Sequence, residues 1–258
     1  MSISKNFRHI ALIPARGGSV GLKDKNLQKI GTTSLVKRAW ESCQDAGFFS
    51  TVCLSTDSTK ISKEVSPEFD LDLADYNSIT FLSKNSAIHK RNELDSGSFS
   101  SVYDLLLRIS TNIKLQFDFL WLIQPTTPFR NRHEFEEIKI IAEMNHDFTS
   151  IVSVKDVNGN HPDRMFKLED KYLEQLCSDN LDSSMPRQLL PKVYIKDGGY
   201  YIFKYELLKD KIFLGNRILP FVRSAINNVN IDSINDLNFA RFIEASRNKD
   251  NQISSLFE

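Results

Sequence analysis

Apolar residues along this chain follow two different spacings, and stretches of the two kinds alternate. In some short runs the apolar and β-branched residues stand at consecutive positions, which is typical of strands buried on both faces of a parallel sheet. In other stretches they recur every three to four residues, as on the buried face of a helix. The runs of the first kind are 9–15, 51–56, 78–82, 117–124 and 149–154, and those of the second kind are 34–46, 101–112 and 132–145. This alternation predicts an α/β fold, a mostly parallel twisted sheet with helices on both faces.

Two of the expected helices carry signals at their ends. Gly47 follows the periodic segment 34–46, and glycine is the residue that most readily ends a helix. Ser233 and Asp236 stand three residues apart at the start of a helical pattern over 233–246. That spacing predicts a capping box at the start of a C-terminal helix.

The alternation is interrupted at 155–198, a polar segment rich in turn-forming residues that contains three prolines. The pattern resumes with two further strands, 200–203 and 218–222. We therefore expect one α/β core built from 1–154 and 199–258, with the intervening residues inserted as an arm.

The charges of the chain balance, because lysines and arginines number 33 and aspartates and glutamates also number 33. A neutral chain has no general attraction for nucleic acid or for a membrane surface, so an anion site requires a local group of cations. The apolar run before Pro14 is too short for a signal peptide, and no later run approaches a membrane span, so we expect a cytoplasmic protein. The three cysteines and five histidines show no CxxC, HxxxH or HExxH spacing, which gives no support to a zinc site.

The first predicted strand runs into a glycine-rich loop, PARGGSVGLKDKN, at 14–26. Glycines let backbone N–H groups approach phosphate oxygens, and Arg16, Lys23, Lys25 and Lys29 can neutralise their charge. The spacing fits neither the Walker motif nor the dinucleotide-binding motif. A flexible turn with solvated lysines is the alternative interpretation of the loop alone.

Three other strand ends carry polar residues, and in an open parallel sheet ligands bind beyond the carboxyl ends of the strands. Asp57 follows a buried strand, and we interpret it as a structural helix cap. Gln124 precedes two prolines and Arg130, so a rigid bend would hold its amide toward a substrate. Asp232 precedes the last helix and is either a cap or a ligand of Mg²⁺ bound with a nucleotide phosphate.

Five segments in register resemble a known family. They are IPARGGSVGLKDKNL, the pair Lys90–Arg91, QPTTPFR, RQLLPKVYIKDGGYYIF and NIDSINDLNFA. Together they resemble the cytidylyltransferases that activate sialic acid and related nine-carbon keto-sugar acids, such as legionaminic and pseudaminic acids, as CMP-sugars. The resemblance implies a Rossmann-like core, an arm that makes a homodimer, and the use of CTP and Mg²⁺.

The resemblance also implies roles for individual residues. Arg16, Lys25 and Asp232 would be catalytic, with Asp232 holding Mg²⁺. The nucleotide contacts would be Pro14, Ala15, Arg16, Gly17, Ser19, Lys25, Asn26, Arg91 and Ser100. The contacts to the sugar acid would be Gln124, Arg187, Gln188, Asp197, Tyr201 and Phe213, the last from the neighbouring subunit.

Four positions depart from the family pattern: Val20 and Asp197 replace the usual Lys and Asn, Asn230 replaces the first Asp of a DxD pair, and Ser98 lies where an Asp is usual. The loss of a cation at 20 removes a charge from the leaving pyrophosphate, and Lys23 is close enough in sequence to supply it. An acid at 197 would suit an amino or amidino substituent on the sugar.

The sequence therefore predicts a reaction in which the anomeric hydroxyl of a keto-sugar acid attacks the α-phosphate of CTP and pyrophosphate leaves. No residue stands out as a general base. Two alternatives remain open: a nucleotidyltransferase for another sugar acid, and a catalytically impaired homologue that binds a nucleotide or a sugar.

Overall fold

The computed structural model describes residues 6–19, 21–69, 78–91, 105, 117–177, 186–210, 214–224 and 227–254. Within these residues an eight-stranded sheet has the order β12-β8-β11-β7-β1-β4-β6-β5. Its strands are β1 (His9–Pro14), β4 (Phe49–Thr56), β5 (Ile79–Ser83), β6 (Ser86–Lys90), β7 (Phe119–Leu122), β8 (Ser150–Asp156), β11 (Tyr194–Lys204) and β12 (Ile218–Val222). The predicted α/β class is confirmed.

Strand directions identify the edge of the sheet where a ligand is expected. β1 pairs in parallel with both β4 and β7, β4 pairs in parallel with β6, and β8 pairs in parallel with β12. In the part of the chain that the structure describes, every antiparallel pair of this sheet includes β11 or β5. The chain moves outward from β1 to β4 and β6 on one side and returns to β7 on the other, so the carboxyl end of β1 is a topological switch point.

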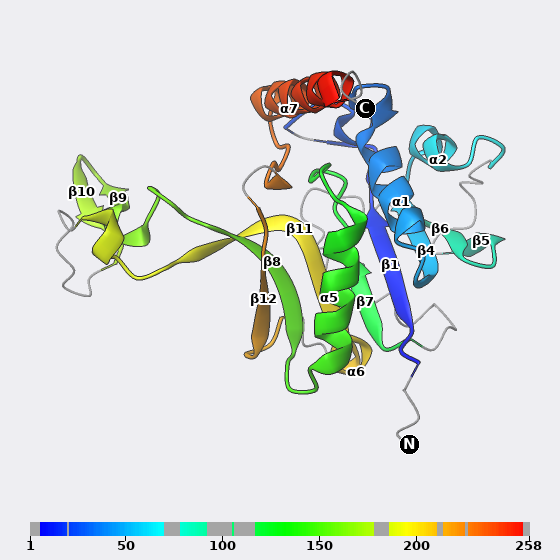
Figure 1. Cartoon of the computed structure of the whole chain (residues 1–258), viewed down its shortest axis with the longest axis horizontal. Coiled ribbons are helices and arrows are strands. Elements are labelled where there is room, and N and C mark those ends of the chain that lie inside the picture. The colour runs from blue at the N-terminus through cyan, green and yellow to red at the C-terminus, as the bar shows by residue number, and fades with distance from the viewer. Residues whose placement is uncertain are drawn as a thin grey trace.

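Helices cover the sheet because successive residues of a central strand point to opposite faces. On β1, Ala11 and Ile13 belong to the core cluster that includes α1 (Leu35–Ala46) and α5 (Arg132–Met144). Ile10 and Leu12 belong to the opposite cluster, which includes Leu208 of α6 (Tyr205–Lys209). Figure 1 shows α1 and α5 lying side by side against the sheet.

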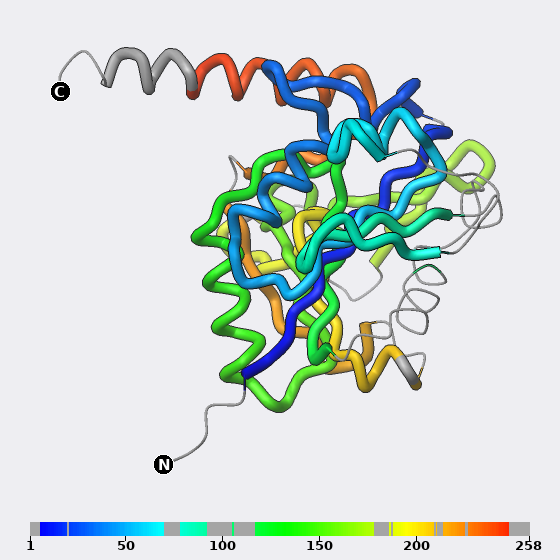
Figure 2. Tube along the Cα trace, turned by 90° about the vertical axis from the view of Figure 1, so that its right-hand side faces the viewer, coloured from blue at the N-terminus to red at the C-terminus, as the bar shows by residue number. Residues whose placement is uncertain are grey.

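The predicted helix signals are confirmed. α1 begins after Ser34, whose side chain accepts a hydrogen bond from the Lys37 N–H, and ends at Gly47 with a left-handed φ of 75°. The last helix, α7 (Ile234–Ser254), starts with the capping box, in which Ser233 and Asp236 bond to each other's backbone N–H groups. α7 is longer than the predicted 233–246, and it lies across the carboxyl ends of the strands in both views (Figures 1 and 2).

One strand assignment from the sequence is wrong. Residues 78–82 were expected to form a buried parallel strand, but β5 is an antiparallel edge strand in which Phe81 is 51% exposed. The parallel partner of β4 is β6, whose sequence SAIHK has little apolar character although its last four residues are buried. The predicted helix over 101–112 lies outside the described residues except for Leu105.

The interrupted part of the pattern extends away from the sheet. β8 and β11 continue as paired strands as far as Asp156 and Tyr194, where they leave the body of the protein (Figure 1). At the far end, β9 (Phe166–Glu169) and β10 (Tyr172–Gln175) form a separate hairpin. Apolar side chains stand exposed on and beside this hairpin: Phe166, Leu168, Tyr172, Leu173, Leu176 and Leu189.

No helix among the described residues is both long and apolar enough to cross a membrane.

Candidate active site

The candidate site begins where β1 ends, between β4 and β7. The Ala15 N–H still donates to the Ser55 carbonyl at 2.8 Å, so the strand pairing continues one residue past Pro14. Ala15 is buried, whereas Arg16 and Gly17 are half-buried and lie at the open edge. The glycine loop therefore leaves the sheet at the switch point, where open α/β folds bind ligands.

Two hydrogen bonds hold this loop in shape. The Gly17 N–H donates to Asp57 Oδ1 at 2.7 Å, and Asn26 Nδ2 donates to the Arg16 carbonyl at 2.9 Å. The interpretation of Asp57 as a helix cap is corrected, because Ser58 occupies the cap position of α2 (Thr59–Val65) and Asp57 fixes the loop instead. The sequence signal that could have identified this role is the position of Asp57, an acid directly after a buried strand.

A cavity of about 470 Å³ lies between the loop and the start of α2. Arg16, Gly17 and Asn26 line it from the loop, and residues 57–61 line it from the other side. Lys60, in that second group, adds a cation that the sequence reasoning did not single out. The cavity therefore brings two cations, Arg16 and Lys60, to the edge of the loop together with the carboxylates of Asp24 and Asp57, the second of which is engaged by the Gly17 N–H.

The structure brings together predicted residues that lie 207 positions apart. Lys25 Nζ lies 3.0 Å from Asp232 Oδ1, and Asn230 Nδ2 donates to Asp232 Oδ2 at 2.7 Å. A Cβ atom on Gly21 would lie 3.0 Å from the Asp232 carbonyl oxygen, so the glycine loop packs directly on this segment. The loop and the residues before α7 consequently form one site.

The donor set around Asp232 fits a cation that is shared with phosphate groups. Asp232 is well exposed and offers a carboxylate, and Asn230 offers a neutral oxygen beside it. Asp236 caps α7, accepting hydrogen bonds from the backbone of Asp232 and Ser233. The described residues contain no group of three or more His, Cys, Asp or Glu side chains suited to a metal. Mg²⁺ is commonly held by one or two carboxylates together with substrate phosphates, so this set fits Mg²⁺ in that form.

A second group of polar side chains surrounds Gly198, beside the carboxyl end of β7. A Cβ atom there would lie 3.1 Å from Gln124 Oε1, 3.2 Å from Thr127 Oγ1 and 3.6 Å from Asn230 Oδ1. Gly198 also has a left-handed φ of 79°, so both its conformation and its surroundings require glycine. Asn230 therefore links two parts of the site. We call the glycine loop with Asp232 the phosphate side, because phosphate groups are expected there. We call the group around Gly198 the sugar side, because Gln124 is expected to face the sugar acid.

Arg130 holds this second group in place. Its Nη2 donates to the carbonyls of Gln124 at 2.7 Å and Gly199 at 3.0 Å, and its guanidinium lies over the Tyr200 ring. Burial lowers the pKa of Arg130 to about 10, and the neighbouring Tyr200 partly opposes this. The two prolines and this arginine together give the rigid bend that the sequence suggested.

The expected role of Asp197 does not agree with the structure. Its side chain is fully buried, and its carboxylate accepts hydrogen bonds from the Gly199 N–H, the Ser153 hydroxyl and Arg223 Nη1. These partners leave the carboxylate no direct path to an amino or amidino group of a sugar. The physical reason is Arg223, the residue that directly follows β12. Its guanidinium is buried and needs a counter-ion, which Asp197 provides.

Arg223 has a second counter-ion in Glu134. Arg223 Nε and Nη2 each lie 3.2 Å from a Glu134 oxygen, and the Tyr200 hydroxyl donates to Glu134 at 2.8 Å. Burial opposes the charge on Arg223, but Glu134, Tyr200 and Asp197 outweigh it and raise its pKa. Burial, reinforced by Glu134, raises the pKa of Tyr200, which stays neutral. This buried network (Glu134, Asp197, Tyr200 and Arg223) lies beneath the Gly198 turn.

The remaining predicted residues fall into four groups. Ser19 is half-buried in the glycine loop. Tyr201 is half-buried on β11 beside Leu122, where burial raises its pKa, and Arg91 is buried just after β6. Arg187 and Gln188 lie in a short 3₁₀ turn, Arg187–Leu189, between the hairpin and β11. Val20, Ser98, Ser100 and Phe213 lie outside the described residues.

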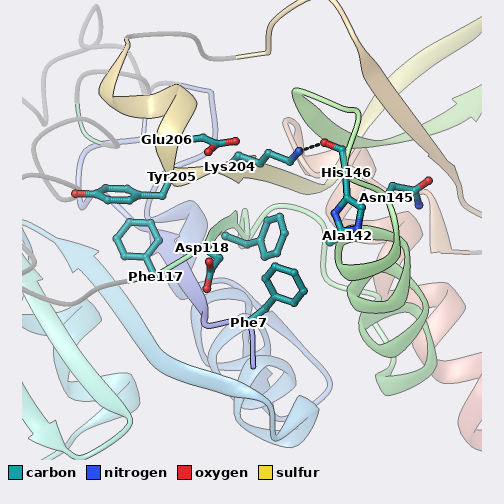
Figure 3. A pocket seen from close by; sticks show the side chains of 10 residues that line it. Phe7, Phe117, Asp118, Ala142, Asn145, His146, Lys204, Tyr205 and Glu206 are labelled. Atoms are coloured by element: carbon teal, nitrogen blue, oxygen red, sulfur yellow. Dashed lines mark hydrogen bonds between the residues drawn. The ribbon is translucent and has the colours of Figure 1, made fainter. Parts of the chain in front are cut away.

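Two other places among the described residues bring polar side chains together, but neither suits a reaction centre. Ser55 Oγ lies 2.9 Å from His89 Nδ1, but both residues are fully buried between strands, where no substrate reaches the serine. A cavity of about 310 Å³ lies at the opposite edge of the sheet, lined by Phe7, Asp118 and Lys204 among others (Figure 3). There Lys204 Nζ points toward His146 and donates to its carbonyl at 2.6 Å, so the cation is already engaged.

Comparison with known proteins gives consistent similarities. A model of the cytidylyltransferase family matches residues 10–72. Post-translational flagellin modification protein B of Campylobacter coli is 24% identical over 242 residues, which cover 93% of this chain and 96% of that protein. CMP-N,N'-diacetyllegionaminic acid synthase of Campylobacter jejuni is 24% identical over 241 residues, with 93% and 96% covered.

Longer relatives match over part of their length. N-acylneuraminate cytidylyltransferase of Escherichia coli O18:K1:H7 is 26% identical over 242 residues, which are 93% of this chain and 53% of that enzyme. The chain thus spans about half the length of such relatives. Together with the family-model match, these alignments confirm the resemblance to sugar-acid cytidylyltransferases.

Solved structures agree in fold. CMP:2-keto-3-deoxy-manno-octonic acid synthetase complexed with CTP superposes with a TM-score of 0.64 at 13% identity, covering 93% of this chain and 99% of that one. The 4-diphosphocytidyl-2C-methyl-D-erythritol synthase of Anaerococcus prevotii gives a TM-score of 0.60 at 11% identity, covering 93% and 97%. The core accordingly has the Rossmann-like arrangement expected from the sequence.

Proposed function

We propose that this chain is a nucleotidyltransferase that joins the cytidylyl group of CTP to the anomeric hydroxyl of a nine-carbon keto-sugar acid, releasing pyrophosphate. The observation that carries the proposal is the contact between Lys25 and Asp232 against the glycine loop. It creates one charged site at the switch point, beside the polar group around Gly198. Alignment over almost the whole length of a CMP-N,N'-diacetyllegionaminic acid synthase supports the choice of a sugar acid as acceptor.

In this proposal the protein acts by positioning the substrates and neutralising charge. The glycine loop presents N–H groups to the triphosphate, and Arg16 and Lys25 offset the negative charge that develops on the leaving pyrophosphate. The Ala15 N–H is already bonded to Ser55, so Ala15 would read the cytosine edge through its carbonyl oxygen. Asn26 and Asp57 keep the loop in the shape that binding requires.

We propose Mg²⁺ as the cofactor, held by Asp232 with Asn230 beside it. When bound, the ion would neutralise the triphosphate and polarise the phosphate under attack.

We propose that Gln124 and Tyr201 face the sugar acid and that Arg187 meets its carboxylate. Asp197 acts indirectly, because its carboxylate fixes the Gly199 N–H and so the turn at Gly198. Selectivity for the substituents of the sugar then rests on neutral groups around Gly198 rather than on an acid.

The exposed apolar side chains of the β9–β10 hairpin support a homodimer as a further part of the proposal. Sedimentation equilibrium of the whole chain tests it directly, with a monomer at micromolar concentration as the contrary result. Because the reaction consumes CTP, we also propose that the protein works in the cytoplasm.

The test is release of pyrophosphate by the purified protein with Mg²⁺, CTP and a panel of nine-carbon keto-sugar acids. We expect turnover with at least one sugar acid and little turnover when CTP is replaced by ATP, GTP or UTP. Turnover with another triphosphate would support the second hypothesis, a nucleotidyltransferase of different specificity. CTP binding without turnover on any sugar acid would rule out the proposal and leave the impaired homologue.

A further inference from the structure

Both carboxylate oxygens of Asp232 accept a hydrogen bond. Lys25 Nζ lies 3.0 Å from Oδ1, and Asn230 Nδ2 donates to Oδ2 at 2.7 Å. Each oxygen keeps a further lone pair, but a divalent cation placed on it would lie close to the Lys25 ammonium group and would compete with it for the carboxylate. Lys25 is the donor whose replacement changes the charge of the site.

Lys25 is placed to exchange partners without a change in the backbone. It begins a short 3₁₀ turn, Lys25–Leu27, in which the Leu27 N–H donates to the Asp24 carbonyl. The side chain of the next residue, Asn26, donates a hydrogen bond to the Arg16 carbonyl and so fixes this turn against the rest of the glycine loop. The side chain of Lys25 is largely buried between Asp232 and this loop, at 16% exposure against 67% for Asp232. Rotation about its side-chain bonds therefore moves the ammonium group from the carboxylate toward the loop.

We infer that Lys25 and the divalent cation compete for Asp232, so that the free protein keeps the ion pair and binds the cation only together with a triphosphate. This inference rests on the proposed function, because it assumes that the loop binds a triphosphate. The triphosphate gives Lys25 a new anionic partner and supplies oxygens to the cation. Without it, the ammonium group and the cation would face one another across a single carboxylate and repel.

Asn230 strengthens this coupling. An amide at this position donates a hydrogen bond to Asp232 and adds no negative charge, so Lys25 is the principal counter-ion of that carboxylate among the described residues. A carboxylate at position 230 would leave a second acid to hold a cation while Lys25 stayed in place. The inference thus predicts that an Asn230→Asp variant binds a divalent cation without nucleotide, whereas the natural chain does not.

The experiment measures binding of Mn²⁺ to the whole protein by the paramagnetic resonance signal of the free ion, first without nucleotide and then with CTP. We expect Mn²⁺ to bind at least about tenfold more tightly when CTP is present, a coupling of ordinary size. By the same linkage, Mn²⁺ has to raise the affinity for CTP by an equal factor. The matched variants are Lys25→Met, which frees Asp232, and Lys37→Met, which removes an exposed lysine of α1.

Lys25→Met and Asn230→Asp should each bind Mn²⁺ without CTP, whereas Lys37→Met should behave as the natural chain does. Tight Mn²⁺ binding by the natural chain without CTP, or equal gains in the two lysine variants, would overturn the inference. Circular dichroism confirms that each variant is folded, and Asn230→Asp decides the outcome if Lys25→Met is not. No sugar and no turnover are needed, so the result stands apart from the pyrophosphate assay; failure of that assay alone removes only the proposed function.

Discussion

The phosphate side and the sugar side of the candidate site are both built around ion pairs, but the pairs are of opposite kinds. On the phosphate side, Lys25 pairs with a well-exposed Asp232 in a single contact. On the sugar side, Arg223 pairs with Glu134 and Asp197 where both Arg223 and Asp197 are closed to solvent. A pair whose carboxylate is open to solvent contributes less to stability and exchanges partners more readily than a fully buried pair, which is costly to break. The Lys25–Asp232 pair therefore suits a site that binds charged ligands. The buried pairs of Arg223 suit a rigid support beneath a neutral pocket.

The largest expected effect comes from breaking the buried network. Arg223→Met leaves the carboxylates of Glu134 and Asp197 buried without their cation, which should lower the free energy of unfolding by about 3–5 kcal/mol. Urea denaturation measures it. The control is Arg132→Met, which removes an exposed partner of Glu136 and should cost less than about 1 kcal/mol. Similar small losses in both variants would contradict the distinction between the two sides.

Removing Lys25 should have the opposite profile, a large effect on rate and a small one on stability. Lys25→Met should lower kcat/KM for CTP about 100-fold, because it removes a cation that faces the leaving group. The free energy of unfolding should change by less than about 1 kcal/mol. Steady-state pyrophosphate release and urea denaturation measure the two quantities.

Lys23→Met is the control for this prediction, since it removes the same charge from an exposed side chain of the same loop. An equal fall in kcat/KM in the two variants would assign the effect to general charge, or would show that Lys23 supplies the cation lost at position 20.

Gly198→Ala tests whether the sugar side responds separately from the phosphate side. The added methyl group would meet Gln124 and Thr127 and would occupy a left-handed conformation, at a cost of about 1–2 kcal/mol in stability. We expect KM for the sugar acid to rise while KM for CTP stays constant, as measured by varying each substrate in turn. The control is Gly159→Ala, whose methyl group would have no atom within 4 Å. A parallel rise in KM for CTP would show that the two sides do not act independently.

The smallest expected effect concerns the cap next to Asp232. The pKa of Asp236 is lowered, chiefly by the hydrogen bond from Ser233, so its charged form stabilises the folded chain. This contribution is present above the ordinary value of 3.8 and is lost as the pH falls below it. Asp236→Asn should therefore reduce stability at neutral pH by at most about 1 kcal/mol, and the difference from the natural chain should shrink near pH 3. A constant difference across that range of pH would exclude this explanation.

The sequence predicted the fold well where local spacing determines burial. The runs at β1, β4, β7 and β8 are apolar enough to show that both of their faces are covered, and α1 carries its own start and stop signals. β6 was missed because its burial comes from its neighbours: β4 and β5 flank it, and His89 is paired with Ser55. No local pattern records such a partner.

The site was predictable to a similar extent. The glycine loop and Asp232 are recognisable in the sequence, but their contact depends on a topology that returns the chain to β1 before α7. The cap position expected for Asp57 and the sugar contact expected for Asp197 were wrong for the same reason, although Asp57 is structural as predicted. The role of each is set by a residue far along the chain, Gly17 in one case and Arg223 in the other.

β11 is a single strand that joins the outer hairpin to the sugar side of the site. It starts at Tyr194, where it pairs with β8 outside the body of the sheet, passes through Asp197 and Gly198, and ends at Lys204, which pairs with Phe119 of β7. A pull or twist applied at the hairpin therefore reaches Gly198 along continuous backbone. In evolutionary terms, the outer hairpin and the turn at Gly198 share one strand, so mutations in the first residues of β11 would act on both.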